Sequence, residues 1–153
     1  MIDHGLEQEL LTHGEYMSTT VGRSMWPLLR NRRESVVIRA VKGELSRGDV
    51  ALYRPPQSDK YVLHRVIRVM EDHYLIVGDN CSVVERIPKE WVIGYMDGFY
   101  RGEKWIPPES RFLRAYARVS VAISPVRRRL VRFREWFWST GSKIKRRLFP
   151  KKS

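Results

Sequence analysis

The chain has 153 residues, of which 42% are hydrophobic, and this is the size of a single domain with its own core. Its net charge of +12 is unevenly placed: residues 1–100 contain 13 Lys/Arg and 14 Asp/Glu, whereas residues 101–153 contain 16 and 3. The single cysteine, Cys81, excludes an internal disulfide framework and a cysteine-rich metal site, and it fits a reducing compartment.

The first twenty residues are polar and acidic, unlike a signal peptide. A bilayer span needs roughly 20 apolar residues, and no stretch of this sequence reaches that length. The least polar stretch, 115–123, is too short and contains Arg118. We therefore expect a protein that is cytoplasmic or attached peripherally to a membrane, without a transmembrane helix.

The first hundred residues predict short strands separated by turns. A short helical turn at 6–11 leads into segments that read as extended, at 16–22, 35–41, 50–54, 61–70, 74–77 and 91–100. Apolar and polar residues alternate over 61–70, and Pro55 and Pro56 end the strand before it. This pattern predicts a lead-in at 1–17 and, over 18–100, a mainly β domain built as a partly open barrel or a sandwich.

The last third predicts a helical, basic extension over 101–153. After Pro107 and Pro108, apolar residues recur at helical spacing: Phe112, Tyr116, Val119 and Ile123. Pro125 lacks the N–H that a helix interior needs, so we expect an interruption there, or the start of a second helix. That helix would carry Leu130, Phe133 and Phe137 on one side and end at Gly141.

Three short segments contain the parts of acyl-transfer chemistry. Ser24 lies in Gly22-Arg23-Ser24-Met25-Trp26-Pro27, His64 follows forty positions later, and Gly78-Asp79-Asn80 comes next. A serine hydroxyl becomes a nucleophile when a base takes its proton, histidine suits this role, and a carboxylate commonly orients the imidazole. Gly22 would allow a close backbone approach, and Pro27 would stiffen the turn that presents the serine.

The same segments resemble a known family. Gly22-x-Ser24-Met25-x-Pro27 resembles the serine box of type I signal peptidases and related peptidases. Gly48-Asp49-Val50 with Leu63-His64-Arg65-Val66-Ile67 resembles the second block of that family, and Gly78-Asp79-Asn80 its third. The resemblance covers roughly residues 18–97 and implies a twisted, mainly antiparallel β peptidase fold.

The base places the chain near one branch of that family. Most bacterial members have a lysine where this chain has His64, and histidine resembles the endoplasmic-reticulum, archaeal and sporulation branch. The resemblance implies Ser24 as nucleophile, His64 as general base, and Asp79 or Glu85 as the orienting acid, with no cofactor or metal. That branch usually has aspartate where this chain has Glu85, so the acid stays open between the two.

The resemblance also implies how a substrate binds. Substrates of the family bind as extended strands and are cut after small residues, with Gly22, Met25 and Pro27 at the substrate. Family members normally carry a membrane-spanning helix before the serine box, and the 23 residues before Ser24 are not apolar. We therefore expect a processing endopeptidase that acts on a precursor peptide or preprotein.

Several alternatives stay open. Asp79 could support a turn, Glu85 could be a solvated charge, and Met25 could fill the core. Cys81 is interpreted as a small, partly buried residue, with a Cys–His protease as the less favoured alternative. At the level of the whole protein, the rivals are a catalytically idle module that binds a peptide or a membrane, and a self-cleaving repressor-type protease.

The basic tail has three interpretations. It is a solvated helix packed on the β domain, or a segment that binds an anionic membrane surface through residues 125–152. Nucleic-acid binding is the least favoured, because no recognition module is visible. The oligomeric state stays open.

Overall fold

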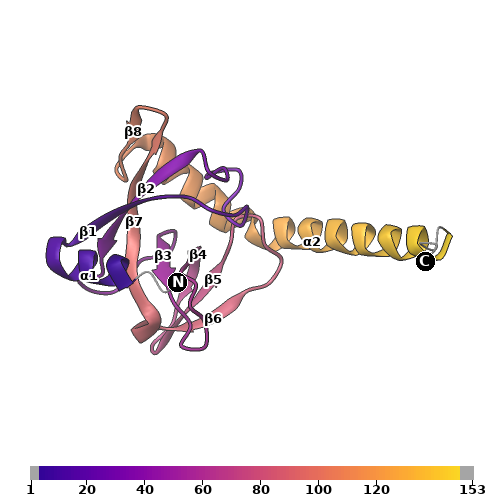
Figure 1. Ribbon diagram of the computed structural model, residues 1–153, viewed down its shortest axis with the longest axis horizontal. Helices are drawn as coiled ribbons and strands as arrows, with labels where there is room; N and C mark the ends of the chain where they lie inside the picture. Colours follow the sequence, from indigo (N-terminus) through magenta and orange to yellow (C-terminus); the bar gives the residue numbers. More distant parts are fainter. Residues whose placement is uncertain (1–3, 149–153) are drawn as a thin grey trace.

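The structure, a computed structural model, describes residues 4–148, and within the last helix it describes side chains up to Phe137. Eight strands form one antiparallel sheet, with a helix at each end of the chain (Figure 1). The predicted mainly β class with a C-terminal helix is confirmed. The sheet is not closed into a barrel.

The sheet has the strand order β1-β2-β7-β3-β4-β5-β6, and β8 pairs with β7. The bounds are β1 (Glu15–Thr19), β2 (Glu34–Ala40), β3 (Val50–Tyr53), β4 (Val62–Val69), β5 (His73–Val77), β6 (Glu85–Pro88), β7 (Val92–Arg101) and β8 (Lys104–Ile106). A short 3-10 helix, η1 (Lys89–Trp91), precedes β7. Strand β7 is ten residues long and pairs with three strands, β2, β3 and β8.

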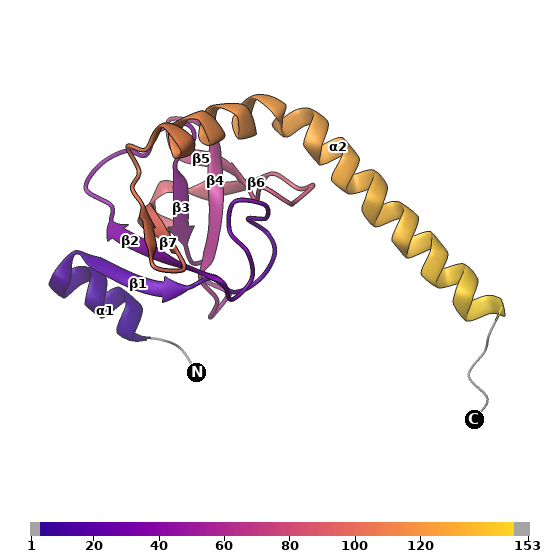
Figure 2. The ribbon, with the colours of Figure 1, turned by 90° about the horizontal axis from the view of Figure 1, so that it is seen from above.

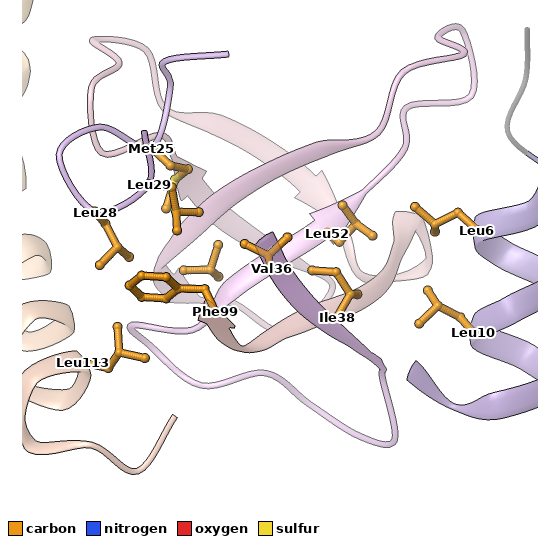
Figure 3. Packing of buried hydrophobic residues seen from close by; sticks show 11 residues of the cluster. Leu6, Leu10, Met25, Leu28, Leu29, Val36, Ile38, Leu52, Phe99 and Leu113 are labelled. Atoms are coloured by element: carbon orange, nitrogen blue, oxygen red, sulfur yellow. The ribbon is translucent and has the colours of Figure 1, made fainter. Parts of the chain in front are cut away.

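The main hydrophobic core lies where the sheet meets α1 (His4–His13) and the loop between β1 and β2 (Figure 3). Val36 and Ile38 of β2 and Phe99 of β7 are at most 4% exposed and point toward this core, as alternate residues of a strand do. The loop adds Met25, Leu28 and Leu29, and α1 adds Leu6 and Leu10. Burial of the three loop side chains fixes the segment that carries Ser24.

The C-terminal helix α2 (Arg111–Leu148) runs without a break for 38 residues. The expected interruption at Pro125 and the expected end at Gly141 are therefore wrong. Pro125 removes one backbone hydrogen bond, but Ser120 before it and Arg127 after it both contact the same buried carboxylate, Asp79, which holds the helix on both sides of the proline. A glycine inside a helix costs about 1 kcal/mol relative to alanine, which is too little to end it.

α2 has two parts in space. Its first turns lie over the sheet, where Leu113 and Val121 are buried, and its later turns project away from the domain (Figure 2). A bend separates the two parts in this view, and a proline inside a helix is a common cause of such a bend. In the described residues, no helix is both long enough and apolar enough to cross a membrane.

Candidate functional site

Ser24 lies in the loop between β1 and β2, and polar contacts define the path of this loop. The Gly22 N–H donates to Asn31 Oδ1 at 2.8 Å, and the Arg32 N–H donates to the carbonyl of Thr20 at 2.7 Å. Gly22 has φ +103°, a left-handed conformation that favours glycine. The glycine of the serine box therefore sets the turn two residues before the candidate nucleophile.

A buried carboxylate holds the far end of this loop. Glu34 is fully buried and accepts hydrogen bonds from the backbone N–H and the Nε of Arg30, at 2.6 and 2.7 Å. Arg101 lies 3.3 Å from the same carboxylate and also donates to the carbonyl of Leu28. Burial alone would raise the pKa of Glu34, but the contacts with Arg30 outweigh it and lower this pKa.

His64 lies on β4, and three strands build its surroundings. Its Nδ1 is 2.8 Å from Glu85 Oε1, and the Tyr53 hydroxyl of β3 donates to Glu85 Oε2 at 2.9 Å. Glu85 begins β6 and pairs with Ile76 of β5, which pairs in turn with Val66 of β4. This register carries the carboxylate across β5 to the imidazole.

The electrostatics of this cluster favour an ion pair. Burial opposes a charged imidazole, but the interactions with Cys81 and Glu85 outweigh it and raise the pKa of His64 to about 9. The hydrogen bond from His64 lowers the pKa of Glu85. Burial, together with the negative charge of Glu85, raises the pKa of Tyr53, so its hydroxyl stays a donor. These interactions therefore favour the protonated form of the imidazole.

The backbone at Gly78 brings the serine loop and the imidazole together. A methyl group placed on Gly78 would lie 2.9 Å from His64 Nε2 and 2.9 Å from the carbonyl oxygen of Ser24. These two atoms are therefore no more than twice that distance apart. The Asn80 N–H also donates to the Ser24 carbonyl at 2.7 Å. Only glycine fits at this junction without displacing one of its neighbours.

The Cys81 thiol also lies at this junction, close to Gly78. Cys81 is partly buried, follows Gly78 in the same turn, and its side chain interacts with His64. Among the described residues, no hydrogen bond joins the Ser24 hydroxyl to His64. The structure thus brings Ser24, His64 and Cys81 to one place, with the imidazole oriented by Glu85.

Asp79, the other candidate acid, belongs to a different cluster. It is 1% exposed, and Arg65 donates to its two oxygens at 2.9 and 2.8 Å. Ser120 of α2 donates to Oδ1 at 2.8 Å, and Arg127 of α2 lies 3.5 Å away. Burial alone would raise the pKa of Asp79, but Arg65 lowers it. Asp79 therefore ties α2 to the sheet, and Glu85 is the acid on His64.

A cavity of about 570 Å³ adjoins Ser24. One side is formed by residues 18–22 of β1 and the serine loop, and the other by residues 60–63 at the start of β4. Met25, Leu29 and Leu52 add apolar surface, and Lys60 is the one charged residue among those that line it. Of the residues expected at the substrate, Gly22 and Met25 line this cavity, and Met25 is also part of the core. Pro27 lies in the turn outside it.

Two residues of the site, Tyr53 and Arg65, were not predicted to have a functional role. Tyr53 was visible only as part of a strand, and Arg65 only as the neighbour of His64 in the second block. The alternation along 61–70 does contain a signal, because it places His64 and Arg65 on opposite faces and so in separate clusters. Within residues 4–148, no group of three or more His, Cys, Asp or Glu side chains could hold a metal ion.

Comparison of the sequence with models of protein families gives no match, and neither does comparison with curated proteins. The resemblance to signal peptidases therefore depends on the three sequence motifs alone.

Proposed function

We propose that the protein is a serine endopeptidase that resembles type I signal peptidases, with Ser24 as nucleophile, His64 as base and Glu85 as the orienting acid. The observation that carries this proposal is the 2.8 Å contact between Glu85 and His64 Nδ1, while the other ring nitrogen, Nε2, lies at Gly78, near which the carbonyl oxygen of Ser24 also lies. Orientation of the imidazole through its other nitrogen is what a catalytic triad requires.

The chemistry follows from these positions. Neutral His64 takes the proton of the Ser24 hydroxyl as its oxygen attacks the peptide carbonyl carbon. The protonated imidazole then gives that proton to the leaving amine as the C–N bond breaks, and water hydrolyses the resulting ester by the same steps. A long nucleophile–base distance in the free enzyme is compatible with this mechanism, because such hydrogen bonds tighten when substrate binds.

The cavity beside Ser24 suits an extended peptide. Strand β1 pairs with β2 along one edge, and residues 18–22 continue from it along the cavity. A peptide strand lying between residues 18–22 and residues 60–63 would pair with backbone groups and place alternate side chains on the apolar floor. This arrangement supports a precursor peptide or preprotein with small, uncharged residues at the cut.

A cysteine peptidase is the second candidate, because the Cys81 thiol and His64 Nε2 both lie close to Gly78. A thiolate beside an imidazolium is a strong nucleophile. We prefer Ser24, since Ser24 lines the cavity and Cys81 is not among its lining residues.

A peptide library tests the proposed function. We expect the purified protein to cut a mixture of unstructured peptides, and mass spectrometry to show small residues such as Ala or Gly on the amino side of the cut. The groove predicts uncharged residues at alternate positions before it. Failure to cut any peptide, combined with tight binding of some of them, would instead indicate a catalytically idle peptide-binding module.

The raised pKa of His64 predicts an alkaline pH profile. The base must be neutral to accept a proton, so kcat/KM should rise about tenfold per pH unit at neutral pH and level off near pH 9. Replacing Cys81 with alanine removes one interaction that raises this pKa, so the rise should move to lower pH. Initial rates from pH 6 to pH 10 for the two proteins measure both effects. A profile that is flat from pH 6 upward would contradict this assignment of the base.

A further inference from the structure

Helix α2 has one face buried against the domain and another whose apolar side chains are exposed. Ser120, Val121, Ser124 and Val131 are buried against the domain. On the opposite side, seven apolar side chains are between 46% and 65% exposed. We call these residues the apolar stripe: Phe112, Val119, Ile123, Val126, Leu130, Phe133 and Phe137. Most are three or four positions apart, so they form one continuous line along the helix.

Positive charges border this stripe. α2 contains twelve Lys/Arg and a single acid, Glu135, which accepts a hydrogen bond from Ser82 of the domain. Arg111, Arg118 and Arg129 lie on one flank of the stripe at helical spacing, and all three are exposed. Arg134 lies on the other flank. A cavity of about 460 Å³ under α2 adds Arg47 and Arg114 on the side of the first flank.

We infer that the apolar stripe binds an anionic phospholipid surface, with the axis of α2 parallel to that surface. An exposed apolar line with arginines on both flanks complements the boundary between acyl chains and negatively charged headgroups. The length of helix beyond the sheet leaves the stripe accessible over several turns (Figure 2). This inference is independent of the proposed peptidase activity.

Charge argues against the other occupants. If a second copy packed its stripe on this one, the flanking arginines of both helices would face each other, and α2 offers no free acid to pair with them. Nucleic acid would satisfy the arginines but leave the seven apolar side chains in water. An anionic lipid surface satisfies both the charge and the apolar area.

Bound in this way, α2 would hold the candidate site close to the lipid. Arg127 contacts Asp79, Arg134 donates to Asn80, and Glu135 accepts from Ser82. All three partners belong to the turn that also contacts Ser24 and His64. A substrate that emerges from a membrane surface would then reach the cavity without free diffusion.

Vesicle sedimentation with the full chain tests the inference. The protein should sediment with vesicles of phosphatidylcholine and phosphatidylglycerol, not with phosphatidylcholine alone, and added salt should weaken the binding. Ile123→Gln/Leu130→Gln/Phe133→Gln should weaken it at least about tenfold, because three apolar side chains leave the lipid. Leu11→Gln/Met70→Gln/Val83→Gln, a matched change of three exposed apolar residues outside α2, should bind as the unmodified protein does.

Charge and self-association are tested in parallel. Arg111→Gln/Arg118→Gln/Arg129→Gln should weaken vesicle binding and reduce its dependence on salt. Equal binding by the stripe variant and the unmodified protein would overturn the inference.

Another contrary result would be that the protein does not bind vesicles but forms a dimer in analytical ultracentrifugation, and that the stripe variant no longer forms this dimer. Tighter binding to RNA than to vesicles, unaffected by the stripe changes, would overturn it as well. Ser24→Ala should bind vesicles normally, so failure of the peptidase proposal leaves this test unaffected.

Discussion

Replacing Ser24 with alanine should lower kcat/KM for a cleaved peptide by at least about 10³-fold, and His64→Ala should do the same. Loss of one member of a nucleophile–base pair removes most of the chemical acceleration, because the remaining member cannot act alone. Ser24 is half-buried on a loop fixed by its neighbours, and His64 is buried on β4. Initial rates on the best peptide from the library measure the effect.

Cys81→Ala is the matched control for this experiment, because Cys81 also interacts with His64. If Ser24 is the nucleophile, this variant keeps activity within about tenfold of the unmodified protein and changes mainly the pH profile. The reverse result, with Ser24→Ala active and Cys81→Ala inactive, would move the nucleophile to the thiol. Circular dichroism of each variant checks that the sheet is intact. The double variant Ser24→Ala/Cys81→Ala should be no less active than Ser24→Ala alone.

The two acids of the site should respond in opposite ways. Asp79→Ala leaves the guanidinium of Arg65, which is 2% exposed, without its carboxylate, and breaking such a buried pair costs about 3–5 kcal/mol. Glu85→Gln should cost less stability than Asp79→Ala, because the Glu85 carboxylate is 36% exposed whereas Asp79 is 1% exposed. It should instead lower kcat/KM about 10²- to 10⁴-fold through the lost orientation of His64.

Urea unfolding of both variants, followed by far-UV circular dichroism, separates these roles. Folding lowers the pKa of Asp79 below its ordinary value of 3.8. Its stabilising contribution is therefore complete above pH 3.8 and is lost as the pH falls through the folded value. The unmodified protein should lose stability in acid more steeply than Asp79→Ala. If Glu85→Gln proved the less stable variant and Asp79→Ala the less active one, the two assignments would have to be exchanged.

Much of the strand pattern could be predicted, because local sequence decides it. The β-branched run before Ala40 and the alternation through Val66 place one set of side chains in the core, and β2 and β4 form there. Strands β6 and β8 were not predicted. They are four and three residues long, and pairing with β5 and β7 creates them rather than their own composition.

The orienting acid could not be chosen from sequence, because the choice depends on strand register. Asp79 and Glu85 are six residues apart, and both follow β5. Glu85 reaches His64 because it is the first residue of β6 and pairs with Ile76. Asp79 lies on the other face of β4, where it accepts hydrogen bonds from Arg65. Neither pairing is encoded in the spacing of the motifs alone.

The path of α2 was misjudged for a related reason. Pro125 and Gly141 are local signals against a helix, and the sequence offers no view of the tertiary contacts that oppose them. A hydrogen bond from Ser120 and an ion pair from Arg127 to one carboxylate hold the helix on both sides of the proline. The apolar residues after Pro125 were expected on one side of a helix, and the structure agrees for those whose side chains it describes.

The pairing of His64 with Glu85 gives folding stability and the proposed activity opposite dependences on pH. Folding raises the pKa of this imidazole from 6.5 to about 9, so its contribution to stability is complete below pH 6.5 and is lost as the pH rises through 9. The same rise in pH would create the neutral imidazole that the proposed peptide cleavage needs. At neutral pH most molecules would thus be stably folded but inactive, and they would not cut other proteins indiscriminately. A bound substrate that takes the place of the thiol beside Nε2 would favour release of the proton and switch the site on.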